Sequence, residues 1–130
     1  SVLKPQLVNG IIATTNAVEP ICIDNLPEDI KSKVYIGLKI PCDYYMPFYL
    51  PGEIILLSAD REPQDGERCI VTSNGGIQIA VKTHIIEYGV RKWRYVSLMS
   101  PNSILPEHII DDMIGYVVGF VNNDGDWGIR

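Results

Sequence analysis

Residues 77–86 read Ile-Gln-Ile-Ala-Val-Lys-Thr-His-Ile-Ile, and this stretch decides the fold class. Side chains alternate between the two faces of an extended chain. One set of alternate positions carries large apolar side chains: Ile77, Ile79, Val81 and Ile85. The positions between them carry small or polar side chains: Gln78, Ala80, Lys82 and His84. The pattern predicts a β-strand with one face toward a hydrophobic core.

Turn signals bracket this strand and recur along the chain. Asn74-Gly75-Gly76 precedes it and Glu87-Tyr88-Gly89 follows it, and glycine tolerates the positive φ of tight hairpin turns. Further extended runs are expected at residues 34–40, 53–58, 68–72, 90–98 and 114–121. Short strands separated by frequent turns predict a mostly β fold, since nothing here shows the strand–helix alternation of a parallel α/β sheet.

The two ends of the chain depart from this pattern. Residues 1–19 show no clear period and predict a linker, which leaves residues 20–130 as the folded domain. Near its start, Asn25, Pro27 and Glu28 predict one short helical turn. Residues 122–125, Asn-Asn-Asp-Gly, predict a loosely held turn.

Composition limits the classes of function. A chain of 130 residues with 46% hydrophobic and 21% charged residues is an ordinary globular domain. Its 11 Lys and Arg residues against 16 Asp and Glu residues give a net charge of −5, so the domain as a whole has no attraction for nucleic-acid phosphates. If the protein binds DNA, we expect another segment to carry that activity.

The cysteines and histidines indicate neither disulfides nor metal. Cys22, Cys42 and Cys69 are odd in number and form no CxxC pair, which is typical of reduced thiols in a cytoplasmic protein. The only histidines, His84 and His108, exclude a His-rich metal cluster, and we expect no cofactor. We also expect no membrane association, because no apolar run approaches the roughly 18 residues of a membrane span.

One motif points to a known family. Residues 42–47 read Cys-Asp-Tyr-Tyr-Met-Pro, and residues 52–57 read Gly-Glu-Ile-Ile-Leu-Leu. This stretch resembles the LexA/phage-repressor peptidase family, which has Gly-Asp-Ser-Met-x-Pro followed by Gly-Asp at the start of an apolar strand. The spacing of Pro47 and Gly52 aligns Tyr44 with the catalytic serine of that family. A register shifted by one residue places Tyr45 there, so a tyrosine replaces the serine in either case.

The resemblance extends over residues 8–121. Residues 61–66, Arg-Glu-Pro-Gln-Asp-Gly, are similar to the family's Arg-x-Pro-x-Asp-Gly turn, and Lys82 falls at the position of its catalytic lysine. Residues 98–102 resemble its Ser-x-Asn loop, and residues 114–120 its closing Ile-x-Gly-x-Val-x-Gly strand. The Asn9-Gly10 bond lies at about the interval where the family has its scissile Ala-Gly bond. The resemblance implies a LexA/signal-peptidase-like β fold of short, strongly bent antiparallel strands.

The same alignment predicts that self-cleavage is lost. In the family, a serine attacks the protein's own Ala-Gly bond while a neutral lysine acts as the base. The hydroxyl of Tyr44 lies about 6.5 Å from its Cβ, against about 1.4 Å in serine, and would overshoot a site built for a short side chain. Asn9 also replaces the alanine of the cleavage site, and Cys42 replaces the leading glycine. We therefore expect no catalytic residues here and no cleavage between Asn9 and Gly10.

The resemblance implies a role in transcription regulation. Proteins of this family carry a DNA-binding helix-turn-helix module N-terminal to this domain, and the domain pairs those modules on operator DNA. The expected function is therefore oligomerisation of a phage or prophage-type repressor, with a homo-oligomer of dimer size or larger. The implied dimer contact lies on the closing strand, at Tyr116, Val118 and Phe120. An antirepressor protein or RecA is a further candidate partner.

Two alternatives remain open from the sequence. One is an active autopeptidase with a changed nucleophile, in which Cys42 works with Lys82. The other is a binding module without DNA-binding function, such as a UmuD-like polymerase accessory or the target of an antirepressor. The Tyr44–Tyr49 segment also has two interpretations, since its aromatic residues suit either core packing or a binding patch.

Overall fold

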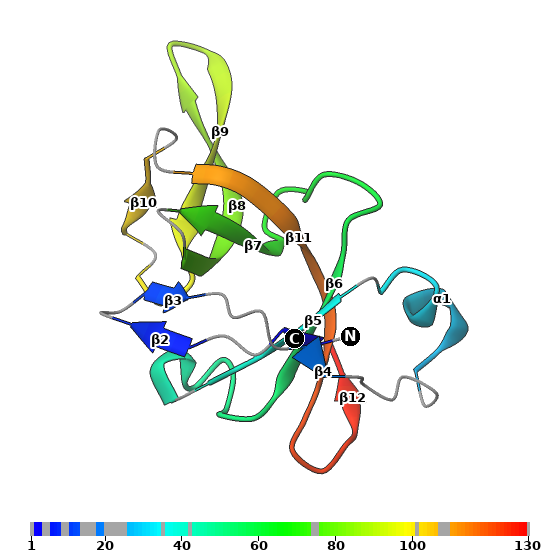
Figure 1. Ribbon diagram of the computed structural model, residues 1–130. Helices are drawn as coiled ribbons and strands as arrows, with labels where there is room; N and C mark the ends of the chain where they lie inside the picture. Colours follow the sequence, from blue (N-terminus) through cyan, green and yellow to red (C-terminus); the bar gives the residue numbers. More distant parts are fainter. Residues whose placement is uncertain are drawn as a thin grey trace.

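The fold was determined from a computed structural model of the 130-residue chain, which describes residues 2–3, 6–8, 11–13, 18–19, 26–34, 36–41, 43–73, 76–100, 102–106 and 110–129. The chain is mostly β, as the sequence predicts (Figure 1). The first strands and helix are β1 (Val2–Leu3), β2 (Gln6–Val8), β3 (Ile11–Ala13), β4 (Val18–Glu19), α1 (Glu28–Lys31), β5 (Ile36–Lys39) and the 3-10 turn η1 (Asp43–Tyr45). They are followed by β6 (Ile54–Ser58), β7 (Arg68–Ser73), β8 (Gly76–Glu87), β9 (Val90–Ser97), β10 (Ile104–Leu105), β11 (Ile110–Val121) and β12 (Trp127–Gly128).

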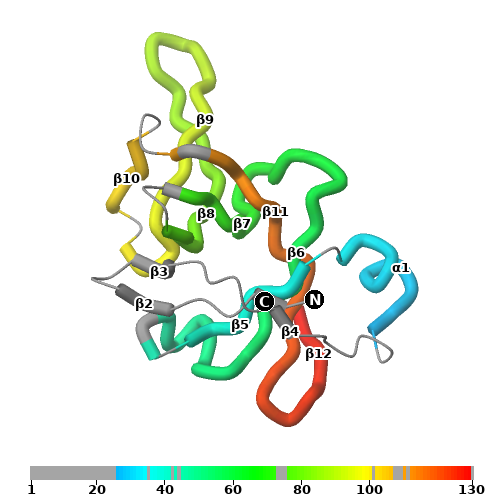
Figure 2. Tube along the Cα trace, in the orientation of Figure 1, coloured from blue at the N-terminus to red at the C-terminus, as the bar shows by residue number. Residues whose placement is uncertain are grey.

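The strands form one strongly bent sheet. Its order is β10-β9-β8-β7-β11-β6-β5-β1-β4, and the neighbours are antiparallel except β1 and β5. The long strand β11 lies between β6 and β7, so it joins the β5–β6 pair to the β7–β8–β9 meander. The tube in Figure 2 shows how β11 curves from one half of the molecule into the other.

The alternation of residues 77–86 is confirmed, and each face of β8 serves a different part of the core. Ile77 and Ile79 belong to a large cluster that also takes in the fully buried Leu38, Ile55 and Ile70. Ala80, on the opposite face, belongs to a smaller cluster with Cys69 and Tyr116. The bent sheet therefore has apolar packing on both faces near its centre.

The turn after β8 is also confirmed. Tyr88 and Gly89 have φ values of 53° and 76°, the positive pair that a two-residue hairpin turn with matching twist requires. The β8–β9 pairing runs in unbroken register from Ala80↔Ser97 to Glu87↔Val90. The resulting hairpin extends away from the body of the domain (Figure 1).

The chain ends differ from the expectation. Within the segment predicted to be a linker, β1 pairs with β5 and β3 pairs with β8, so the described parts join the main sheet. The turn at residues 122–125 is held in place, because the Asn122 side-chain oxygen accepts hydrogen bonds from the backbone N–H groups of Asp124 and Asp126, both at 2.9 Å. It connects β11 to β12, which pair at Phe120↔Gly128 and Val121↔Trp127.

The aromatic segment that begins in η1 contributes to the core. Tyr45 and Tyr49 are buried, and the Tyr49 hydroxyl lies 3.1 Å from Nη1 of Arg68. The Arg68 guanidinium also lies 5.2 Å from the centroid of the Phe48 ring. Met46 and Leu50 stay partly exposed. For Tyr45 and Tyr49, core packing is therefore the correct interpretation.

Candidate functional site

Lys82, which the sequence resemblance aligns with a catalytic lysine, lies where β8 leaves the body of the sheet. The β7–β8 pairing ends at Arg68↔Val81, one residue before it. The Lys82 backbone N–H donates to the Glu67 carbonyl at 3.0 Å, and the Lys82 carbonyl accepts from the Gly66 N–H at 2.7 Å. The turn at residues 61–66 therefore fixes the backbone position of this lysine.

The Lys82 side chain faces an aromatic ring. It is half-buried, and its Nζ lies 5.2 Å from the centroid of the Trp93 ring. Trp93 therefore lies beside the side chain that the sequence resemblance aligns with a catalytic base.

A small cavity opens at the same place. Its volume is about 220 Å³, and its walls come from Lys82, Trp93, Arg94, Tyr95, Leu105 and Ile110. The β9–β10 pairing Leu105↔Tyr95 brings the third segment of this wall to the hairpin. The cavity combines apolar and aromatic walls with an ammonium group at the base of the hairpin.

The described thiol near Lys82 is buried in its protonated form. Cys69 is fully buried, and burial raises its pKa to about 12 although the charge of Lys82 lowers it. Burial also raises the pKa of the Tyr95 hydroxyl above its ordinary value. Both groups are thus protonated near neutral pH, whereas nucleophilic attack requires the ionised form.

The other predicted cleavage residues cannot be placed against Lys82. Tyr44 lies in η1, but its side chain is outside the described part of the structure. Asn9, Gly10 and Cys42 also lie outside the described residues. The absence of cleavage, and the alternative in which Cys42 is the nucleophile, therefore stay predictions.

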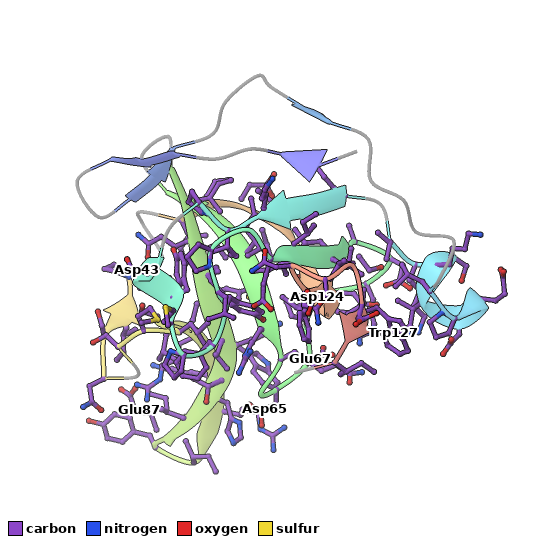
Figure 3. The ribbon with its side chains drawn as sticks, turned by 90° about the horizontal axis from the view of Figure 1, so that it is seen from below. Asp43, Asp65, Glu67, Glu87, Asp124 and Trp127 are labelled. Atoms are coloured by element: carbon purple, nitrogen blue, oxygen red, sulfur yellow. The ribbon has the colours of Figure 1, made fainter. Side chains whose placement is uncertain are left out.

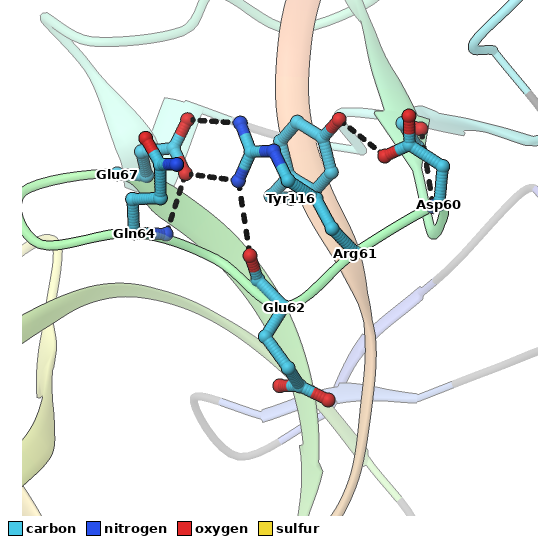
Figure 4. A network of polar contacts seen from close by, with 7 residues as sticks. Asp60, Arg61, Glu62, Gln64, Glu67 and Tyr116 are labelled. Carbon is cyan, nitrogen blue, oxygen red and sulfur yellow. Dashed lines mark hydrogen bonds and ion pairs between the residues drawn. The ribbon is translucent and has the colours of Figure 1, made fainter.

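A polar network joins the turn at residues 61–66 to the closing strand (Figure 4). The Arg61 guanidinium contacts the Glu67 carboxylate through two nitrogens, at 2.7 and 3.0 Å. The same guanidinium lies 4.0 Å from the centroid of the Tyr116 ring. The Tyr116 hydroxyl in turn donates a hydrogen bond to Asp60 Oδ1. Stacking and hydrogen bonding thus position β11 against the turn that holds Lys82.

This network shifts the ionisation of its acidic groups. The hydrogen bond from Tyr116 lowers the pKa of Asp60 below its usual value of 3.8, although desolvation opposes the shift. The hydrogen bond from Arg61 lowers the pKa of Glu67 in the same way. Burial, reinforced by Asp60, raises the pKa of the Tyr116 hydroxyl. At neutral pH the two carboxylates and the guanidinium are therefore charged, while the tyrosine keeps the proton that it donates.

We expect the substitution Tyr116→Phe to raise the pKa of Asp60 toward 3.8, because it removes the largest cause of the shift. A lowered folded-state pKa contributes stability above the unfolded-state pKa, and that stability is lost as the pH falls through the folded-state value. The free energy of unfolding of Y116F should therefore decrease less than that of the unsubstituted protein as the pH is lowered. The measurement is an NMR titration of the Asp60 carboxyl carbon, with Tyr95→Phe as a control. An unchanged Asp60 pKa in Y116F would contradict the assignment.

The three residues of the implied dimer contact lie on β11 but not on one face. Tyr116 is 3% exposed and Phe120 is 7% exposed, and Val118 is half-buried. The β11–β6 register shifts between Val117 and Gly119, which interrupts the alternation. As a result, Tyr116 and Val118 pack with the smaller core cluster and Phe120 with the larger one. Of the three, Val118 offers the most accessible surface to a partner.

Sequence reasoning did not find most of the cavity. For its aromatic wall, the only signal in the sequence was the alternation of Arg91, Trp93 and Tyr95 along β9. Leu105 and Ile110 carry no signal, since they reach the cavity only through pairing of the strands around it. His84, expected on the Lys82 face, has its Nδ1 2.9 Å from Asp65 Oδ2, so the turn at residues 61–66 contacts this face as well.

Figure 3 shows how the acidic side chains are distributed around the sheet: Asp65 and Glu67 near the turn, Glu87 at the end of the hairpin, and Asp43 and Asp124 elsewhere on the body. Among the described residues, no three His, Cys, Asp or Glu side chains converge as they would around a metal ion. In the same part of the chain, no helix is both long and apolar enough to cross a membrane. No protein-family model matches the chain, and no curated protein shows significant similarity to it.

Proposed function

We propose that this chain is the regulatory domain of a cytoplasmic transcription repressor of the LexA/phage-repressor type, and that it holds repressor subunits together without cleaving itself. In this proposal, operator DNA is bound by a helix-turn-helix segment N-terminal to the domain. The domain's own work is association, which matches the two-fold symmetry of paired half-sites.

One observation carries the proposal: three segments on which the sequence resemblance rests meet at one place. The turn at residues 61–66 hydrogen-bonds to the backbone of Lys82 and stacks on Tyr116 of the closing strand. Motifs that merely follow one another in sequence have no reason to lie together in space. Their contact supports a common architecture with the family.

The surroundings of Lys82 support the loss of cleavage. Its Nζ lies 5.2 Å from the centroid of the Trp93 ring, and burial raises the pKa of the Cys69 thiol to about 12. Together with a tyrosine at the serine position, the protonated thiol leaves the reaction without a described nucleophile. In this proposal the scaffold of the domain is kept while its chemistry is not.

Sedimentation equilibrium tests the association. We expect a dimer or larger species at high micromolar concentration, because a domain that pairs repressors must associate by itself. A monomer under those conditions would overturn the proposal. Val118→Asp tests the β11 contact, since a carboxylate placed in an apolar interface costs desolvation energy. Near-UV circular dichroism of V118D verifies that the fold is kept.

The matched control for V118D is Ile86→Asp, which introduces the same carboxylate on the hairpin, where Ile86 is 70% exposed. If V118D dissociates the oligomer and I86D does not, the β11 contact stands. If I86D dissociates it instead, the contact lies on the hairpin and the assignment to β11 is wrong, although the proposed function stands.

Intact-mass spectrometry of the same samples tests the loss of cleavage. We expect a single full-length mass after prolonged incubation at alkaline pH and with activated RecA filaments. A fragment ending at Asn9 would show that the domain is an active autopeptidase. A Tyr44→Ser variant tests whether the rest of the site is intact. Cleavage regained by this variant would require a usable base at Lys82.

A further inference from the structure

The β8–β9 hairpin is an arm with no third strand over most of its length. Pairing with β7 ends at Val81, and pairing with β10 is limited to Tyr95 and Val96. Residues 82–94 therefore form a two-stranded ribbon among the described strands, closed by the tight turn at Tyr88 and Gly89. We call residues 82–94 the arm.

The arm carries charge of the opposite sign to the rest of the chain. It holds four basic residues and a single carboxylate, Glu87, in a protein of net charge −5. The Lys92 ammonium lies 3.6 Å from the Glu87 carboxylate, which offsets one of the positive charges. The remaining basic residues are Lys82, Arg91 and Arg94. The acidic character that the composition indicates thus belongs to the body of the domain.

Two of the basic residues share one face of the arm with aromatic side chains, while Lys92 and Arg94 lie on the other face. The register pairs Lys82↔Tyr95, His84↔Trp93 and Ile86↔Arg91 place these residues on the same side, because directly paired residues point to the same face. Trp93 is 44% exposed, with the Arg91 guanidinium 5.7 Å and the Lys82 Nζ 5.2 Å from its ring centroid.

The tip of the arm is apolar and open to solvent. Ile86 is 70% exposed, Tyr88 is 97% exposed and Val90 is 58% exposed. Side chains this large and this exposed are uncommon on a soluble domain, and a group of them marks a contact surface.

We infer that the arm is a nucleic-acid contact, in which the two-stranded ribbon lies in a groove of duplex DNA, its basic residues meet the phosphates, and its apolar tip packs against or between bases. A groove of DNA admits a two-stranded ribbon. Proteins that bind the minor groove combine basic side chains with apolar wedges inserted between base steps, and strands are used in either groove. The inference goes beyond the proposed function, because it does not require the subunits to pair.

The acidic body does not prevent this contact. Asp65 of the body contacts His84, and the strand extends about 10 Å further from His84 to Glu87 at the usual rise of a β-strand. The Debye length at physiological ionic strength is about 8 Å, so carboxylates of the body are largely screened at the tip. Nearest the tip lie Arg91 and the ion pair of Lys92 with Glu87, so the field that a phosphate meets there is positive.

Fluorescence anisotropy with a labelled duplex of random sequence tests the inference on this 130-residue chain. We expect saturable binding at low salt, with a logarithmic salt slope of about −3, because about three or four basic residues displace counterions. Arg91→Gln should weaken binding severalfold and reduce that slope by about one. In a Trp127→Phe background, quenching of Trp93 should follow the same binding curve.

Lys33→Gln is the control, since it removes one charge from an exposed residue of the body. We expect it to leave the affinity within a factor of about two, because Lys33 lies outside the contact. Absence of duplex binding at low salt, or equal losses in R91Q and K33Q, would overturn the inference. Polyglutamate binding as tightly as the duplex would also overturn it, because the arm would then serve an acidic protein. Subunit association, measured separately, is unaffected by any of these outcomes.

Discussion

Replacing Gly115 with alanine is expected to lower the free energy of unfolding by about 3 kcal/mol, which is the upper end of the usual cost of adding a methyl group to a packed core. A Cβ at this position would lie 2.6 Å from the Ser58 carbonyl oxygen and 3.4 Å from the Leu57 Cβ. The first contact is with backbone of the adjacent strand β6, and that backbone cannot rotate away as a side chain can. Relief would require β11 and β6 to separate where the sheet joins its two halves.

Urea unfolding measures this effect, with Gly125→Ala as the control. Gly125 has a φ of 86°, but a Cβ added there would meet nothing within 4 Å, so alanine introduces only backbone strain. We expect a loss of about 1 kcal/mol from G125A. If G115A were no less stable than G125A, the close approach of β11 to β6 would be wrong.

Cys69 is expected to react with a disulfide reagent about a thousandfold more slowly in the folded protein than in the unfolded chain. Burial raises its pKa from 9.0 to about 12, which lowers the thiolate fraction at pH 8 by about three powers of ten, although a thiolate of higher pKa is more nucleophilic and offsets part of this loss. The side chain is also fully buried, which slows the reaction further. The thiol should therefore become reactive mainly when the protein unfolds.

The measurement uses a variant in which Cys22 and Cys42 are replaced by serine, so that a single thiol is followed with and without denaturant. A folded-state rate within a factor of about ten of the unfolded rate would contradict the burial of Cys69. In that case Cys69 would become a candidate nucleophile beside Lys82. The slow rate that we expect leaves the proposed loss of chemistry intact.

The long strands could be predicted because their side chains alternate over enough residues to show a period. Residues 77–86 are expected as a strand, and β8 runs from Gly76 to Glu87. The closing strand is expected to begin at residue 114, but β11 begins at Ile110. The earlier start escapes sequence reasoning because Asp111 and Asp112 look like a solvated edge, and because register shifts on either side of Met113 interrupt the alternation.

The rest depends on contacts between segments that are distant in sequence. Strands of two or three residues, such as β1 and β3, are too short to carry a period and form only because β5 and β8 offer partners. The same holds for Phe120, which a simple alternation assigns to the face of Tyr116 until the bulge near Gly119 is known. For the site, the sequence could predict Lys82 and the turn at residues 61–66, but not that Trp93 would lie beneath the ammonium group.

The place of β11 between β6 and β7 has a consequence for folding during synthesis of the chain. While the chain is being synthesised, β6 and β7 each keep one unpaired edge until residues 110–121 have left the ribosome. The large core cluster draws on both halves, so it cannot close earlier either. Unpaired edges recruit other strands, so the nascent chain is most exposed to aggregation in this interval. Folding of this domain is therefore a late event that follows synthesis of its last long strand, and a chaperone that shields strand edges would act just before it.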